Sequence, residues 1–164
     1  MSLPELTCPI AITPGDPCGI GPEIMAEAIK VLNVIEARND VKFELNEAAF
    51  GGQAYFDHGD AFPEATKKIC DEADAIIKGP IGLSHEESQK IPVDMQPERG
   101  ALLPMRARYN TYANYRPVSL PKAIAHFSPL KPEVIGDGID LIIIRELVGG
   151  LYFGSKKSGV DDQG

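Results

Sequence analysis

A guanidinium group and a phenol follow a short apolar segment near the C-terminal end of the sequence. Residues 139–144 are apolar apart from Asp140 and rich in β-branched side chains. This pattern predicts a strand that is buried on both faces. Arg145 ends the run, and Tyr152 follows shortly after it. The sequence therefore predicts that a buried strand carries both groups to one rim of a sheet, where α/β proteins bind small ligands.

A second candidate site is the glycine-rich turn GDPCGIGPE at residues 15–23. An apolar segment precedes it, and apolar residues at helical spacing follow it, so the three together open a βα unit. The glycines allow a ligand to approach the backbone closely, and the free N–H groups of a helix start favour anions. The turn is not the dinucleotide fingerprint, because Ile24 stands where a third glycine is required. On local evidence, a turn that merely reverses the chain is an equal alternative.

The elements between these two candidate sites predict an α/β fold with a parallel sheet. Strands are expected at residues 9–13, 41–45 and 73–77, and helices at residues 20–35 and 63–71. This β-α-β-α-β order is typical of parallel sheets. Further along we expect a long loop at residues 79–98, a short helix at residues 100–109 and a strand at residues 112–120. That last strand contains Pro117, which places it at a sheet edge or strand end.

Composition excludes several classes of function. The 164 residues carry a formal charge of −8, from 16 basic and 24 acidic side chains. Without a cluster of basic residues this charge argues against nucleic acid as a partner, although a local focus of arginines could bind a small anion. The cysteines lack a metal-binding spacing, which argues for reduced thiols in the cytoplasm. No signal peptide or long apolar segment is present, so we expect a chain that is neither secreted nor membrane-spanning.

Several long segments resemble the β-decarboxylating dehydrogenases of the isopropylmalate and isocitrate type. They are the GIGPE turn, residues 51–80, residues 101–118 (ALLPMRARYNTYANYRPV) and residues 128–154 (SPLKPEVIGDGIDLIIIRELVGGLYFG). Their order and spacing follow the family over nearly the whole chain. Several long motifs make a specific signal, whereas a lone glycine turn would not. The resemblance implies an α/β fold of the isocitrate/isopropylmalate dehydrogenase kind, based on a parallel sheet and incomplete at its C-terminal side.

The family oxidises a 2-hydroxy acid and then releases carbon dioxide, using NAD or NADP with Mg²⁺ or Mn²⁺. The resemblance implies that Arg106, Arg116 and Arg145 bind the substrate and that Tyr152 is the catalytic acid that protonates the enolate. Guanidinium groups suit this task because paired, charge-assisted hydrogen bonds fix the angle of a carboxylate as well as its position. Taken singly, each arginine is expected to be a surface or ion-pairing residue, and Tyr152 a packing residue.

The resemblance also implies cofactor contacts at Ile20 and Lys78, with metal ligands outside this segment of chain. One departure concerns the turn, where Pro17-Cys18 precedes the GIGPE motif. The string TPGDPCGIGPE is similar to the opening of the 4-hydroxythreonine-4-phosphate dehydrogenases, which share the fold. The later NYRP and RELVGGLYFG segments do not fit that branch, so it is a minor alternative.

Two features bear on the substrate. Lys78-Gly79-Pro80 resembles the isocitrate branch, whereas Leu102 and Leu103 resemble the isopropylmalate branch. The leucines offer an apolar wall, against which a third carboxylate would lose its hydrogen bonds to water. We therefore expect a substrate such as 3-isopropylmalate, with isocitrate, homoisocitrate or tartrate as alternatives.

The family continues well past the length of this chain. Residues 1–99 correspond to the N-terminal part of the first α/β domain, and residues 100–164 to the start of the second, substrate-binding and dimerisation domain. We expect the fragment to be inactive alone. It is either part of a longer enzyme, or a natural short homologue that binds a dicarboxylate or assembles without catalysis, or a structural remnant. Open sheet edges favour a homodimer or other self-association.

Overall fold

The computed structural model describes residues 6–17 and 19–149. The chain divides into two compact units, Met1–Met105 and Arg106–Gly164. The sequence placed the domain boundary between residues 99 and 100, whereas this division falls inside helix α5 (Leu103–Arg108). Within the described residues, no helix combines the length and the apolarity that crossing a membrane requires.

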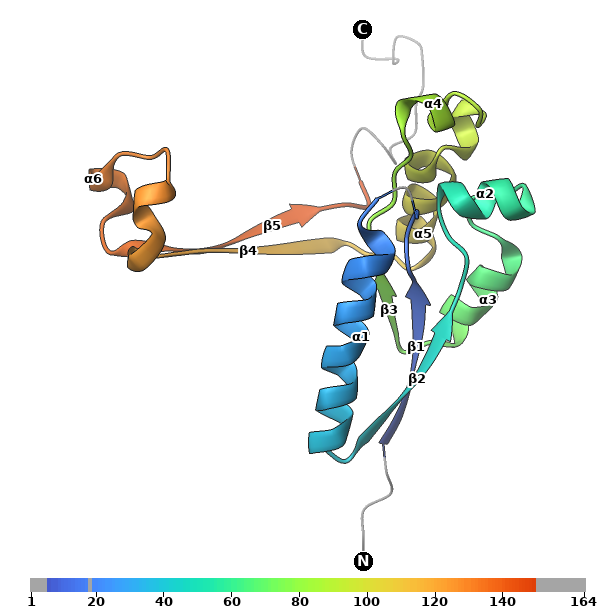
Figure 1. Cartoon of the computed structure of the whole chain (residues 1–164), viewed down its shortest axis with the longest axis horizontal. Coiled ribbons are helices and arrows are strands. Elements are labelled where there is room, and N and C mark those ends of the chain that lie inside the picture. Colours follow the sequence, from blue (N-terminus) through green and yellow to red (C-terminus); the bar gives the residue numbers. More distant parts are fainter. Residues whose placement is uncertain (1–5, 18, 150–164) are drawn as a thin grey trace, which may run out of the picture. The chain divides into compact units, whose positions relative to one another are not determined.

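The first unit contains a parallel sheet in the order β2-β1-β3 (Figure 1). Its strands are β1 (Leu6–Thr13), β2 (Val41–Glu47) and β3 (Ala75–Lys78). Helix α1 (Gly21–Arg38) connects β1 to β2, and α2 (Gly52–His58) and α3 (Glu64–Glu72) connect β2 to β3. The connection from β1 to β2 and the connection from β2 to β3 step in opposite directions along the sheet, so right-handed crossovers place α1 and α3 on opposite faces. The predicted parallel α/β fold is confirmed.

One hydrophobic cluster of this unit lies between α1 and one face of the sheet. Ile10 and Ile12 alternate on the central strand β1, and Met25 of α1 packs against them. Five partly buried apolar residues complete the cluster: Ile29, Leu32, Phe43, Leu45 and Ile77. Met25 and Leu32 belong to the spacing that predicted the helix, and Phe43 and Leu45 to the alternation that predicted the second strand. Ile20, Ile24 and Ile35, which share the predicted helical spacing, are exposed.

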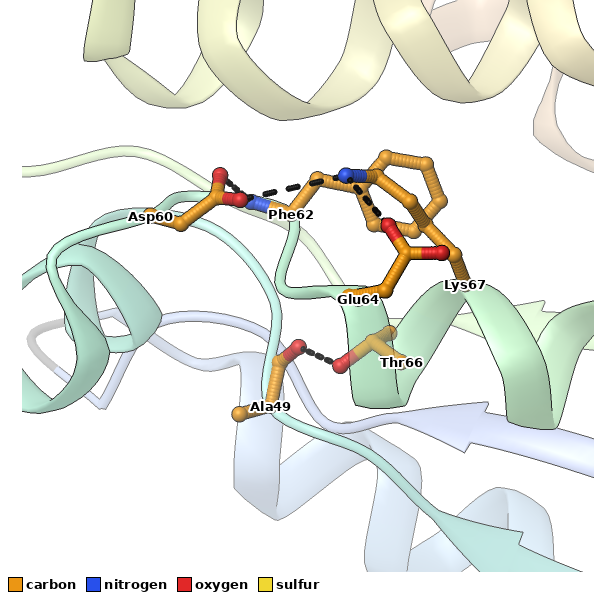
Figure 2. Close-up of polar contacts among 6 residues, drawn as sticks. All are labelled: Ala49, Asp60, Phe62, Glu64, Thr66 and Lys67. Atoms are coloured by element: carbon orange, nitrogen blue, oxygen red, sulfur yellow. Dashed lines mark hydrogen bonds and ion pairs between the residues drawn. The ribbon is translucent and has the colours of Figure 1, made fainter.

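The start of α3 is held against the segment that follows β2 (Figure 2). The buried Thr66 hydroxyl donates a hydrogen bond to the Ala49 carbonyl at 2.6 Å. The Phe62 N–H donates to the Asp60 carboxylate at 2.9 Å, and the Lys67 ammonium lies 5.4 Å from the centre of the Phe62 ring. These contacts fix the start of α3, although its N-cap residue, Pro63, forms no side-chain cap hydrogen bond.

The expected long loop after β3 contains short helical turns. They are α4 (His85–Ser88), a 3₁₀ turn (Val93–Met95) and a π-helix (Pro97–Leu102) that leads into α5. Ser84 and Glu87 form a capping box at the start of α4, which satisfies two backbone N–H groups. Each piece is one or two turns long, which explains why periodicity did not reveal it.

The second unit contains an antiparallel ribbon of β4 (Ala113–Pro121) and β5 (Gly138–Glu146). A 3₁₀ turn (Lys122–Phe127) and α6 (Pro132–Ile135) join the two strands. The strand expected at residues 139–144 is present, but the prediction that it is buried on both faces is wrong. Ile142 and Ile144 are 61% and 63% exposed. In the described chain the ribbon has only two strands, so its apolar side chains extend from faces that no second layer covers.

This difference predicts that substitution of two isoleucines lowers stability by very different amounts. Ile12→Ala removes a side chain that is 2% exposed and is expected to lower the free energy of unfolding by about 2–5 kcal/mol. Ile144→Ala in the ribbon is expected to cost less than about 1 kcal/mol. Urea unfolding followed by circular dichroism measures both. A larger loss for Ile144→Ala than for Ile12→Ala would contradict the placement of the core.

Candidate functional site

Two of the predicted substrate arginines lie on one face of the ribbon. Asn114 pairs with Arg145, and Arg116 pairs with Ile143, in the antiparallel register. Directly opposite residues share a face, as do residues two apart on one strand, so both arginines project from the same side. The Arg116 Nε donates a hydrogen bond to the Asn114 Oδ1 at 2.7 Å. Asn114 therefore orients one guanidinium group while standing directly across from the other.

The third arginine, Arg106, is half-buried near the end of α5 and belongs to the same unit. Burial lowers the pKa of Arg106, and the positive charges of Arg145 and then Arg116 lower it further. Like charges act in this way only when they lie close enough to repel. The structure thus brings Arg106, Arg116 and Arg145 within electrostatic range of one another, and we call these three residues the arginine cluster.

Glu146, the acidic residue that follows Arg145, forms hydrogen bonds with the backbone of the next turn. The Glu146 carboxylate accepts hydrogen bonds from the N–H groups of Val148 and Gly149, at 2.6 and 2.7 Å. In the part of the chain that the structure describes, no carboxylate lies within ion-pair distance of the three guanidinium groups. The arrangement concentrates positive charge without a protein counter-ion, which is a suitable arrangement for binding a small anion with more than one carboxylate.

The other predicted site residues lie in the first unit or outside the description. Leu102 and Leu103 are half-buried where the π-helix passes into α5. Ile20 is 63% exposed at the N-cap of α1. Lys78 is the last residue of β3, and its ammonium donates to the Gly79 carbonyl at 2.8 Å. Tyr152 lies outside the described residues.

Sequence reasoning missed Asp16, the most buried acidic residue of the first unit. Its side chain is 1% exposed and accepts hydrogen bonds from the N–H groups of Gln53 and Gly82, each at 2.8 Å. Those donors lie beyond the ends of β2 and β3, whereas Asp16 lies beyond the end of β1. The available signal was an acidic residue in a short turn of glycines and prolines that follows a strand now known to be buried.

A cavity of about 410 Å³ opens at the carboxyl ends of β1 and β2. Pro14, Gly15 and Pro17 line one side, and Phe50, Gln53 and Asp57 belong to the other. None of the residues predicted to bind substrate or cofactor lines this cavity. Among the described residues, no group of three or more histidine, cysteine, aspartate or glutamate side chains is placed to hold a metal ion.

A parallel α/β unit followed by a ribbon that bears an arginine cluster places the chain among the α/β proteins. Comparison with known families makes the class specific. The family model for isocitrate/isopropylmalate dehydrogenases matches residues 9–164, so the chain belongs to this family.

Among curated relatives, the 3-isopropylmalate dehydrogenase of Geobacter sulfurreducens is 48% identical over 155 residues, which cover 94% of this chain and 41% of that protein. The enzyme of the same name from Vibrio parahaemolyticus is 44% identical over 148 residues, 90% of this chain and 40% of the relative. The chain therefore spans about two fifths of the length of these relatives.

Two solved structures share the fold. Isocitrate dehydrogenase from Methylococcus capsulatus matches with a TM-score of 0.66 and 27% identity, covering 94% of this chain and 39% of that one. A β-decarboxylating dehydrogenase from Thermococcus kodakarensis matches with a TM-score of 0.58 and 27% identity, covering 94% and 38%. The isocitrate/isopropylmalate dehydrogenase-like fold predicted from the sequence is confirmed.

The arginine cluster predicts an unusual response of stability to charge removal. Arg145→Gln relieves repulsion on Arg106, so the free energy of unfolding is expected to stay constant or rise by about 0.2–1 kcal/mol. Sulfate at constant ionic strength should raise the melting temperature of the original chain more than that of the variant. Arg38→Gln, at the exposed end of α1, is the matched control and should retain the sulfate effect. A clear loss of stability in Arg145→Gln without sulfate would contradict the repulsion.

The direction of the Arg106 pKa shift also determines how the free energy of unfolding depends on pH. The pKa of Arg106 is lowered in the folded chain, so the unfolded chain binds the proton more tightly. The contribution of this group to stability therefore rises with pH, but only in the strongly alkaline range where arginine titrates. Between about pH 6 and pH 9 the cluster keeps its charge, and stabilisation by sulfate is expected to be constant. Thermal unfolding in that range, with and without sulfate, tests this, and a sulfate effect that disappears by pH 9 would contradict it.

Proposed function

We propose that this chain carries the substrate-binding part of an enzyme that oxidatively decarboxylates a 2-hydroxy dicarboxylate such as 3-isopropylmalate. The observation that supports this most is the arginine cluster, in which three guanidinium groups of one unit influence each other with no counter-ion among the described residues. Family membership and the names of the relatives agree with the proposal.

The chemistry of the cluster suits a dicarboxylate. Two carboxylates need two or more guanidinium forks, and each fork can form two parallel hydrogen bonds with one carboxylate. Binding would also relieve the repulsion that lowers the pKa of Arg106, so the free energy of ligand binding includes the loss of an unfavourable interaction. A monocarboxylate offers half the negative charge and is expected to bind more weakly.

The remaining roles follow from the family. We assign Leu102 and Leu103 to the recognition of an apolar substituent on the substrate, and Ile20 and Lys78 to contacts with NAD or NADP. Tyr152 is proposed as the acid that protonates the enolate after carbon dioxide leaves. A divalent metal, Mg²⁺ or Mn²⁺, supplies Lewis-acid stabilisation of that enolate in this family, and its proposed ligands lie outside this segment of chain.

The proposed setting is the cytoplasm, and the proposed assembly is a homodimer. The exposed apolar side chains of the ribbon, Ile142 and Ile144 among them, support an assembled state, because apolar patches of this kind mark interaction surfaces. They also support a second candidate function, in which the chain binds a dicarboxylate or assembles with another subunit without catalysis.

Calorimetric titration tests the substrate class. We expect 3-isopropylmalate to bind the chain without metal or cofactor, and Arg116→Gln or Arg145→Gln to weaken binding by about 10- to 100-fold, since a hydrogen bond to a charged group contributes about 1.5–3 kcal/mol. Arg38→Gln is the matched control and should bind normally. A folded chain that binds no dicarboxylate would overturn the proposal. Binding without NAD reduction, when the whole gene product is assayed with Mg²⁺, would favour the non-catalytic candidate.

Substitution of the leucine wall tests the choice among substrates. Leu103→Ser introduces a hydroxyl that can donate to a third carboxylate, so it should shift preference from 3-isopropylmalate toward isocitrate by about 10- to 100-fold. The affinity ratio of the two acids, measured by calorimetry for the original chain and the variant, gives the shift. Leu103→Ile keeps the side chain apolar and is the control. An unchanged ratio in Leu103→Ser would remove this residue from substrate recognition.

A further inference from the structure

Asp16 occupies an unusual place in the first unit. Its carboxylate is 1% exposed, yet it belongs to a turn at the carboxyl end of the central strand. Both oxygens are used: Oδ1 accepts from the Gln53 N–H and Oδ2 from the Gly82 N–H, each at 2.8 Å. A buried carboxylate is costly unless it is hydrogen-bonded. The ionised side chain is therefore stable only when segments 37 and 66 positions away along the chain are both in place.

Backbone contacts join the same segments. The Asp16 N–H donates to the Pro80 carbonyl at 3.2 Å, and the Gly79 N–H donates to the Thr13 carbonyl at 2.7 Å. A Cβ atom on Gly15 or Gly79 would overlap the opposing backbone, so these two turns pack main chain against main chain. Glycine at these positions permits the close approach.

A third segment approaches the carboxylate from the other side. Gly51, at the N-cap of α2, has φ = 92°, and a Cβ atom there would lie 2.9 Å from the Asp16 Oδ2. The absence of a side chain at Gly51 lets α2 begin close enough for the Gln53 N–H to reach Oδ1. The turns that follow β1, β2 and β3 thus meet at one carboxylate.

We propose that Asp16 is a positioning residue that fixes the β1–α1 turn against the segment after β3. Ile20 ends the first of these, and Lys78, the last residue of β3, directly precedes the second. By holding the two together, Asp16 presents both positions at the carboxyl edge of the sheet in one fixed arrangement. The identification of Ile20 and Lys78 as cofactor contacts rests on the proposed function, whereas the linkage of the turns does not.

Asparagine in place of Asp16 tests the linkage. Asp16→Asn keeps the shape but replaces one acceptor oxygen with an NH₂ group that faces a backbone donor. Hydrogen exchange by NMR should show the Gln53 and Gly82 amides exchanging at least about tenfold faster, with the β1–β2 ladder still protected. Asp60→Asn is the matched control, because the contacts of Asp60 are local: it accepts a hydrogen bond from the Phe62 N–H and forms a 3.8 Å ion pair with Lys67, seven positions away. Unchanged protection of Gln53 and Gly82 in Asp16→Asn would overturn the proposal.

If the chain with Asp16→Asn does not fold, a second variant, Gln53→Pro, still tests the proposal. Gln53→Pro removes the donor to Oδ1 and leaves the carboxylate intact, and proline is tolerated in the first turn of a helix. If the carboxylate couples the turns, the Gly82 amide should exchange several-fold faster in this variant than in the original chain. Exchange of Gly82 at its original rate would show that the segments are independent and would overturn the proposal.

Titration with NAD, followed through the amide signals of Ile20 and Gly79, separates the linkage from the proposed cofactor role. We expect Asp16→Asn to weaken the NAD response at least about tenfold and Asp60→Asn to leave it unchanged. Faster exchange with undiminished NAD affinity would show that Asp16 supports the fold without positioning the cofactor contacts. If the original chain shows no response to NAD, the proposed cofactor contacts fail, and the exchange measurement still decides whether Asp16 links the turns.

Discussion

The first unit depends on one carboxylate that three turns share. A parallel sheet places the ends of its strands at a common edge, but nothing in the sheet itself fixes the turns that follow them. Asp16 supplies that constraint. Its buried carboxylate accepts hydrogen bonds from the Gln53 and Gly82 N–H groups, and it would lose them if these segments moved apart. Hydrogen bonds to an ionised group are shorter and stronger than those between neutral groups. The two bonds therefore hold the turns close to Asp16.

The second unit uses charge in the opposite way. Asp16 is a negative charge with its hydrogen-bonding needs met, whereas the arginine cluster is a set of positive charges brought together without a counter-ion among the described residues. Like charges held close together reduce stability, and a bound anion would offset that cost. Asn114 holds the Arg116 guanidinium by a hydrogen bond, whereas the Glu146 carboxylate accepts hydrogen bonds from the turn after β5.

Local pattern was sufficient to predict much of the fold. The parallel sheet and its helices followed from strands of apolar residues alternating with helical spacing, and the family followed from motifs around Arg106, Arg116 and Arg145. Burial of β5 could not be predicted, because a run of isoleucines has the same appearance whether or not a second layer covers it. Asp16 escaped notice because its role depends on donors that are distant in sequence, and no spacing rule connects an acidic residue to a backbone N–H.

The proposed function requires that the three arginines act as one site for a dicarboxylate. Nitrogen-resolved NMR of the arginine Nε–H groups, recorded while 3-isopropylmalate is added, observes each guanidinium separately. We predict that the signals of Arg106, Arg116 and Arg145 shift together with a single dissociation constant, while that of Arg38 stays in place. Independent shifts with different constants, or equal shifts at Arg38, would contradict it.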